Sequence, residues 1–242
     1  RLMASLGSML LYWYHFSVNG KRIDVETDDD SVGGHFLHLL HGEKPPESWV
    51  RAMHTSLNLY AEHEFNASTF AARVIAGTGS DMYSAITGAI GALRGPKHGG
   101  ANEVAFHIQS RYHSADEAEA DIRERVAHKE IVIGFGHPVY TVGDPRNDVI
   151  KRVARGLAEE NNDLRMFDIA DRIESVMWEA KKMFPNLDWF SAGPSKHPVF
   201  GRVIEGMDVV QAIGKAEVDP SDKPTSEIKI ESMMFETRKI EE

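Results

Sequence analysis

The 242-residue chain contains no cysteine. That absence excludes disulfide bonds, thiolate metal sites and a cysteine nucleophile, and it suits a reducing compartment. Basic residues are also scarce, since 27 Lys and Arg stand against 37 Asp and Glu, for a formal net charge of −10. This charge gives no electrostatic basis for binding nucleic acid or an anionic membrane. We therefore expect a cytoplasmic protein in which local groups must make any anion site.

Long hydrophobic runs are missing as well. Since no apolar run reaches about 18 residues, no membrane span is predicted. The opening stretch RLMASLGSMLLYWYHF is apolar, but no small-residue cleavage site precedes SVNGKR. We interpret residues 2–16 as a buried helix rather than a signal peptide. The chain starts at Arg1 within that helical pattern, so we expect it to begin inside a longer protein.

Helical periodicity dominates the sequence as far as Ala192. The 42% hydrophobic content is enough for a core, and apolar residues recur at helical spacing between short Gly- and Pro-containing connections. After Gly193 the pattern changes to HPVFGRVIEG and EIKIESMMFET, which are typical of strands, with MDVVQAIG as a short helix between them. The predicted helices before that point cover residues 2–16, 33–42, 47–65, 80–95, 114–130, 144–160 and 166–184.

Histidine is abundant, with twelve in the chain, which raises the question of a metal site. His35, His38 and His41 share one predicted helix. Steps of three and six residues turn a helix by about 300° and about 600°, so these side chains diverge. His63 and Glu64 lack the second histidine, four residues on, that a zinc protease helix requires. We therefore predict no metal site.

Three loops each present one acid–base group. GPKHGGANE places His98 among Gly and Pro before a helix. IVIGFGHPVYTVGDPRN places His137 after a β-type run and two glycines, and FPNLDWFS places Asp188 among apolar neighbours. Any one loop is explained by a turn or a helix cap. Three such loops together favour a catalytic site.

These loops carry a family resemblance. With AEHEFNASTFAARV, GPKHGGANE, GFGHPVYTVGDPRN and PNLDWFS, residues 1–192 resemble the citrate synthase family. HPVYT after GFG favours its 2-methylcitrate synthase branch. The resemblance implies a transferase of propionate catabolism. It would join the α-carbon of propionyl-CoA, or of acetyl-CoA, to the ketone of oxaloacetate through an enolate and then hydrolyse the thioester. The acyl-CoA is a substrate, so no cofactor is expected, and a homodimer is implied.

The resemblance also implies residue roles. An α-proton of a thioester is a weak acid, so its removal needs a base together with stabilisation of the enolate oxygen. Asp188 matches the family's base, and His98 matches the group that hydrogen-bonds the thioester oxygen. His137 matches the group that polarises the ketone of oxaloacetate. The residues that match substrate-binding positions are His63 and Arg146 for oxaloacetate, and Gly134, Phe135 and Gly136 for the adenine of CoA.

The fold implied is mainly α, with a large domain formed from both ends of the chain and a small domain inserted between them. We predict part of the large domain in residues 1–99 and the small domain in residues 100–192. The family's segments before and after these residues have no counterpart here, and neither do two further arginines that bind oxaloacetate. Helices before residue 95 are therefore expected to expose apolar faces that absent partners would cover.

Residues 193–242 resemble the C-terminal end of a cyclophilin-type peptidyl-prolyl isomerase. KHPVFGRVIEGMDVVQAIG and EIKIES carry this likeness, and His197 matches a pocket histidine of that family. One or two strands cannot close an eight-stranded barrel. We expect a short β-containing segment joined to the helical part at Ala192–Gly193 without a linker.

Three functional hypotheses follow from these patterns. The first is a condensing enzyme of the 2-methylcitrate synthase type. The second is a catalytically inactive chimeric fragment that only self-associates through its exposed helices. The third, which has the least support, is a peptidyl-prolyl cis-trans isomerase.

Overall fold

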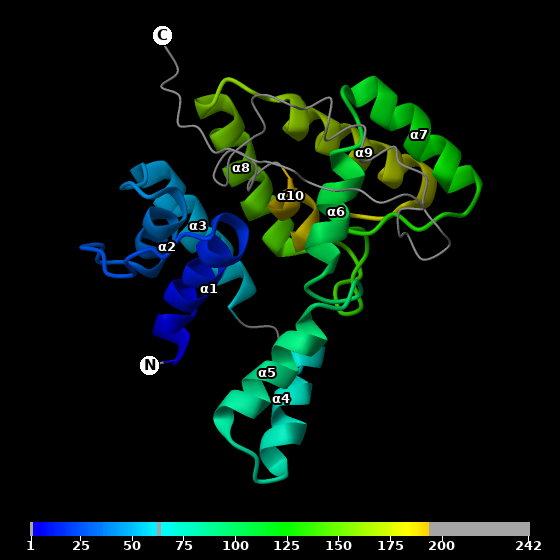
Figure 1. Ribbon diagram of the computed structural model, residues 1–242. Helices are drawn as coiled ribbons and strands as arrows, with labels where there is room; N and C mark the ends of the chain where they lie inside the picture. The colour runs from blue at the N-terminus through cyan, green and yellow to red at the C-terminus, as the bar shows by residue number, and fades with distance from the viewer. Residues whose placement is uncertain (1, 62–63, 194–242) are drawn as a thin grey trace, which may run out of the picture. The chain divides into compact units, whose positions relative to one another are not determined.

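The structure is a computed structural model that describes residues 2–61 and 64–193 (Figure 1). The described residues all belong to one unit of the chain, Arg1–Gly201. The strands and short helix predicted after Gly193, and with them His197, lie outside the described residues. The domain boundary at residues 99 and 100 stays a prediction.

The regular secondary structure of the described residues is helical. The β-type pairing among them is one isolated bridge, between Phe135 and Pro185. This confirms the prediction of a mainly α fold. In chain order the helices are α1 (Leu2–Asn19), α2 (Val32–His41), α3 (Glu47–Tyr60), α4 (Ala67–Gly77), α5 (Met82–Leu93), α6 (Ala101–Gln109), α7 (Ala115–Ala127), α8 (Pro145–Glu160), α9 (Arg165–Lys181) and α10 (Leu187–Ala192).

Most predicted helix boundaries agree with the structure to within three residues, because capping side chains mark them. Ser31 begins α2, where its hydroxyl accepts the Gly34 N–H at 3.1 Å. The helix predicted over residues 47–65 is the exception, since α3 ends at Tyr60. A separate helix, α4, then starts at Ala67 and is capped by Asn66, whose side chain accepts the Thr69 N–H at 3.0 Å.

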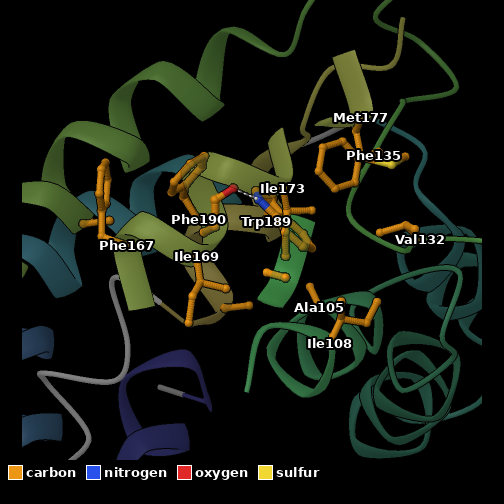
Figure 2. Close-up of a cluster of buried hydrophobic side chains, with 14 of the residues drawn as sticks. Ala105, Ile108, Val132, Phe135, Phe167, Ile169, Ile173, Met177, Trp189 and Phe190 are labelled. Carbon is orange, nitrogen blue, oxygen red and sulfur yellow. Dashed lines mark hydrogen bonds between the residues drawn. The ribbon is translucent and has the colours of Figure 1, made fainter. Parts of the chain in front are cut away.

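The short helix α10 lies at the centre of the main hydrophobic cluster. Helices α6, α8 and α9 pack around it, and α7 packs along α9. Trp189 and Phe190 of α10 are fully buried, and the Trp189 indole N–H donates to the Ala170 carbonyl at 3.0 Å. Figure 2 shows these rings among Ile169 and Ile173 of α9. A helix buried on most of its surface must be largely apolar, as LDWFSA is apart from Asp188.

Helices α1 to α5 bury much less apolar surface. In α1 only Leu11 is buried, while Met3, Trp13 and other large apolar side chains are exposed. The prediction that residues 2–16 form a buried helix is therefore wrong, because among the described residues α1 has α2 as its main packing partner. The prediction that helices before residue 95 expose apolar faces is confirmed.

The hairpin of α4 and α5 shows this exposure most plainly. The two helices pack on each other (Figure 1), yet α4 contains no buried residue and α5 only Ala85.

In the described part of the chain, no helix is both long enough and apolar enough to cross a bilayer.

Candidate active site

Two loops that are far apart in the sequence are joined by backbone hydrogen bonds. The Gly136 N–H donates to the Phe184 carbonyl at 2.8 Å, and the Asn186 N–H donates to the Gly134 carbonyl at 2.9 Å. This short antiparallel pairing connects the loop of His137 to the start of α10. The loops predicted to carry His137 and Asp188 are therefore brought together.

Gly134 is required in this pairing for two reasons. Its φ of 103° lies in the region that side chains rarely adopt. In addition, a Cβ at this position would lie 2.6 Å from Cε3 of Trp189. The glycine therefore allows the His137 loop to lie directly against the buried indole.

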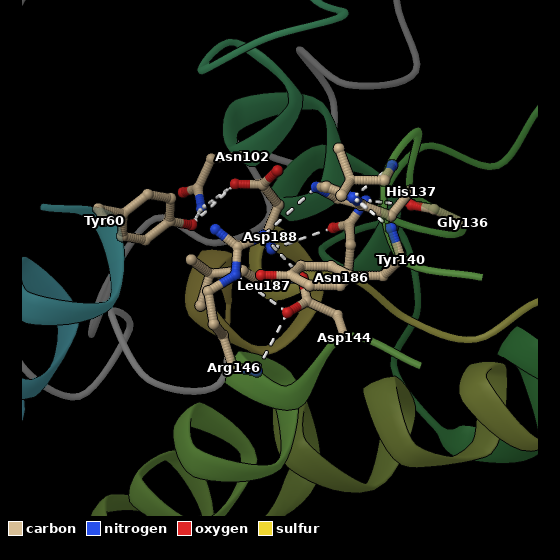
Figure 3. Close-up of polar contacts among 11 residues, drawn as sticks. Tyr60, Asn102, Gly136, His137, Tyr140, Asp144, Arg146, Asn186, Leu187 and Asp188 are labelled. Atoms are coloured by element: carbon tan, nitrogen blue, oxygen red, sulfur yellow. Dashed lines mark hydrogen bonds and ion pairs between the residues drawn. The ribbon is translucent and has the colours of Figure 1, made fainter. Parts of the chain in front are cut away.

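The Asn186 side chain joins both loops as well. Its Oδ1 accepts the Asp188 N–H at 3.1 Å and so caps α10. Its Nδ2 donates to the Gly136 carbonyl at 3.0 Å. One amide thus fixes the backbone on which Asp188 and His137 stand (Figure 3).

The His137 ring is held by its own loop. Its Nδ1 accepts the N–H groups of Val139 and Tyr140 at 3.1 and 3.2 Å. Because Nδ1 is the acceptor, we assign the neutral tautomer with its proton on Nε2. That Nε2 lies 3.4 Å from Nη2 of Arg146. Two donors side by side suit an oxygen acceptor, such as a ketone or a carboxylate, placed between them.

Arg146 is positioned by Asp144, which caps α8. The carboxylate accepts from the Arg146 Nε at 2.9 Å, from Nη2 at 2.8 Å and from its backbone N–H at 3.0 Å. Burial opposes ionisation of Asp144, but the bonds from Arg146 outweigh it and hold the pKa of Asp144 below its usual value. The same carboxylate accepts the Leu187 N–H at 3.0 Å. Asp144 thus links the Arg146 guanidinium to the loop of Asp188.

Asp188 is half-buried, between the buried side chains of Leu187 and Trp189. Its Oδ1 accepts the Tyr60 hydroxyl at 2.7 Å and the Asn102 Nδ2 at 3.3 Å. Figure 3 shows Tyr60 reaching it from α3 and Asn102 from the first turn of α6. The carboxylate is therefore held by side chains from two other helices.

His98 is bonded to the start of α4. Its Nε2 lies 2.9 Å from the Ser68 hydroxyl and accepts the Ser68 N–H at 3.3 Å. We therefore assign its proton to Nδ1, which leaves an N–H donor on the other side of the ring. Four residues further on, Asn102 contacts Asp188. The loop of His98 thus reaches the Asp188 site through the start of α6, whereas His63 lies outside the described residues.

A largely apolar cavity of about 840 Å³ opens beside Asp188 and its partner Tyr60. Asp188 and Asn102 are among its polar lining residues, and Met53, Leu57 and Ile90 are among the apolar ones. A pocket of this size with few polar groups is typical of sites for organic ligands.

Sequence reasoning missed four residues of this site. Asn102, Asp144 and Asn186 stand inside the motifs GPKHGGANE, GFGHPVYTVGDPRN and PNLDWFS, which were themselves predicted to be functional. Their placement next to the predicted residues was the available signal. The sequence placed Tyr60 only in the helical spacing of apolar residues. Such spacing predicts that a side chain packs on a helix face and does not predict a hydrogen bond to a carboxylate.

A second cluster lies away from this site. Asp28, Asp29 and His38 bring possible metal-ligand atoms within 4.8 Å of one another. The His38 Nδ1, however, lies 2.7 Å from the Asp29 carboxylate, so these two groups already satisfy each other. His35 instead bonds to the hydroxyls of Ser8 and Thr27. Nothing in this geometry requires a cation.

Comparison with known proteins shows to which family the chain belongs. The family model for the citrate synthase C-terminal domain matches residues 1–197, so the chain belongs to the citrate synthase family. A second family model, for cyclophilin type peptidyl-prolyl cis-trans isomerases, matches residues 180–235. Most of that second range lies outside the described residues.

Individual members of this family are similar to the chain over part of their own length. A 2-methylcitrate synthase of Shewanella oneidensis is 50% identical over 192 residues, which cover 79% of this chain and 51% of that protein. Citrate synthase 2 of Bacillus subtilis is 42% identical over 68% of this chain and 44% of that protein. The citrate synthase of Thermoplasma acidophilum, solved as a ternary complex with carboxymethyl coenzyme A and oxaloacetate, has a TM-score of 0.76 and 28% identity. That match covers 98% of this chain and 66% of the solved one. The chain thus spans about half the length of the curated relatives it matches.

Proposed function

We propose that the chain carries the acid–base part of a condensing enzyme of the 2-methylcitrate synthase type. Its substrates are oxaloacetate and an acyl-CoA, with propionyl-CoA as the preferred donor and no separate cofactor. The observation that carries this proposal is the pairing of two loops that brings His137, Arg146 and Asp188 together. The name of the Shewanella oneidensis relative supports the choice of propionyl-CoA, and we place the reaction in the cytoplasm and in propionate catabolism.

The proposed reaction begins when the Asp188 carboxylate takes a proton from the α-carbon of the acyl-CoA. An N–H of His98 donates to the thioester oxygen as the enolate forms. The nucleophilic α-carbon then attacks the ketone carbon of oxaloacetate, and the new alkoxide takes the proton from Nε2 of His137. Arg146 and His63 bind oxaloacetate, and residues 134–136 bind the adenine of CoA. Water finally cleaves the thioester and releases the CoA thiol.

Thiol release from CoA tests this proposal directly. The chain contains no cysteine, so a thiol reagent reports only the CoA that is set free. We expect oxaloacetate-dependent release that is faster with propionyl-CoA than with acetyl-CoA. Asp188→Asn should slow it about 10²–10⁴-fold, because that is the usual contribution of a general base.

Asp168→Asn is the matched control, since Asp168 is an exposed carboxylate in the first turn of α9. It should leave the rate unchanged. An Asp188→Asn variant as active as wild type would refute the assignment. A folded wild-type chain without release would favour the inactive fragment instead.

We also propose that the chain forms a homodimer. The observation that supports it is the exposed apolar surface of the α4–α5 hairpin, which includes Phe70, Val74 and Ile90. Sedimentation of wild type beside Phe70→Ser tests this, because a weaker dimer is expected in the variant. A wild-type chain that stays monomeric at high concentration would argue against the dimer.

The match of the cyclophilin family model to residues 180–235 supports a kinship of the C-terminal segment with that family. We propose no isomerase activity for it. A short segment supplies too few strands for the closed barrel that this architecture requires.

A further inference from the structure

Tyr60 makes a long-range contact that the proposed reaction does not yet use. It is the last residue of α3, and its hydroxyl donates to Oδ1 of Asp188 at 2.7 Å, across 128 positions of sequence. The Tyr60 residue is 43% exposed, so packing alone does not account for its position. The contact instead joins α3 to the carboxylate of the proposed base.

Asn102 fixes the direction of this hydrogen bond. Its Nδ2 donates to the Tyr60 hydroxyl oxygen at 3.0 Å and lies 3.3 Å from Oδ1 of Asp188. With the phenolic oxygen accepting from Asn102, its own hydrogen points to Asp188 (Figure 3). Although the residue as a whole is partly exposed, desolvation around its hydroxyl, and next the negative charge of Asp188, raise the pKa of Tyr60. The phenol therefore stays protonated and remains a donor.

A carboxylate on an unrestrained side chain has no single preferred orientation, because the last torsion of aspartate is broad. The Asn186 cap fixes the backbone of Asp188, but it leaves that torsion open. The Tyr60 hydroxyl, at 2.7 Å, restricts it by holding one carboxylate oxygen, with a longer contact of 3.3 Å from Asn102 to the same oxygen. The other oxygen, Oδ2, then has a defined direction.

We propose that Tyr60 is a positioning residue that holds Oδ1 of Asp188 so that Oδ2 takes the α-proton of the acyl-CoA. This inference rests on the proposed function, since it assigns Asp188 the role of base. Orientation of a reacting group is a large part of catalysis, so loss of the hydroxyl should slow proton removal without removing the base.

The first test measures kcat and KM of CoA release by Tyr60→Phe, per mole of folded enzyme. We expect kcat to fall about 10-fold with KM nearly unchanged, because the ring remains and only the hydroxyl that orients the carboxylate is lost.

Tyr83→Phe is the matched control, since Tyr83 is a 73% exposed tyrosine of α5. It should leave both kcat and KM unchanged. A merely structural role of Tyr60 would lower the amount of folded enzyme but would not change kcat per mole of folded enzyme. An unchanged kcat in folded Tyr60→Phe would therefore overturn the inference.

The second test needs no turnover. In protein with ¹³C-labelled tyrosine, the NMR signal missing from Tyr60→Phe identifies Tyr60. In Asp188→Asn that signal should have a different chemical shift at neutral pH than in wild type, because the charged acceptor of the hydroxyl is gone. An equal shift in both proteins would overturn the contact and the inference with it.

The two tests separate the possible failures. If wild type releases CoA and Asp188→Asn does not, the proposed function stands, and kcat of folded Tyr60→Phe decides the inference alone. If wild type releases no CoA, the proposed function fails and Tyr60 has no base to position. The NMR comparison of wild type with Asp188→Asn would then show whether the contact itself is real.

Discussion

The described chain contains two regions that use similar residues and reach different degrees of packing. In α6–α10, isoleucines such as Ile122, Ile150 and Ile169 are fully buried. In α1–α5, large apolar side chains such as Met3 and Met82 remain mostly exposed. Amphipathic spacing therefore specifies a helix and an apolar face in both regions, but burial also requires an element that packs on that face.

The neighbours of each helix account for the contrast. The α10 helix is surrounded by α6, α8 and α9, whereas within the described residues α4 packs mainly on α5. The exposed region is nevertheless part of the site, since α3 provides Tyr60. The contact between Tyr60 and Asp188 thus connects the two regions where the proposed chemistry occurs.

The largest expected effect is the loss of an indole from the packed region. Trp189→Ala would remove a fully buried side chain and its hydrogen bond to Ala170. We expect the free energy of unfolding to fall by about 3–5 kcal/mol. Urea unfolding followed by far-UV circular dichroism measures this. A loss below about 1 kcal/mol would mean that α10 is not the centre of the core.

A smaller effect is expected from Asp144→Asn, which breaks a buried ion pair with Arg146. The free energy of unfolding should fall by about 3 kcal/mol at pH 7, because the guanidinium loses its partner. The folded pKa of Asp144 lies below its unfolded value of about 3.9. The pair therefore stabilises the fold fully above pH 3.9 and loses its contribution as the pH falls through the folded pKa.

Urea unfolding of wild type and Asp144→Asn at several pH values checks this linkage. The difference between the two proteins should shrink toward acid pH. A difference that stays constant between pH 7 and pH 3 would contradict the assigned pKa direction.

The smallest effect is expected in the exposed region. Phe70→Ser replaces a 61% exposed ring of α4, so the free energy of unfolding of the monomer should change by no more than about 0.5 kcal/mol. Phe167→Ser in α9 is the matched change at a buried ring and should cost several times more. Equal losses in dilute protein would show that both regions are packed alike.

Local signals made most of the fold predictable from sequence. Caps such as Ser31 and Asp144, together with helical spacing, mark the helix starts closely. The error over residues 47–65 arose because helical spacing continues past Tyr60, while the Asn66 cap that starts α4 was not recognised. The burial expected for α1 was wrong because hydrophobicity does not reveal whether a packing partner is present.

The site was predictable to the extent that its residues lie in motifs. His137, Arg146 and Asp188 stand in motifs with a family likeness, and the structure brings them together. The bonds of Tyr60 and of Asn186 join positions far apart in the chain. Such bonds follow from tertiary packing, which a single sequence does not encode at any one position.

Gly134 has a consequence for the range of sequences that this fold accepts. Gly20 and Gly42 also have positive φ, but a Cβ at either would meet open space. Asparagine or aspartate, which adopt such angles at modest cost, would be tolerated there. At position 134 both the positive φ and the nearby Trp189 indole exclude a side chain. A residue that tolerates this φ would therefore still clash with the indole. A library randomised at all three positions and selected for folding should therefore diversify at 20 and 42 and return only glycine at 134.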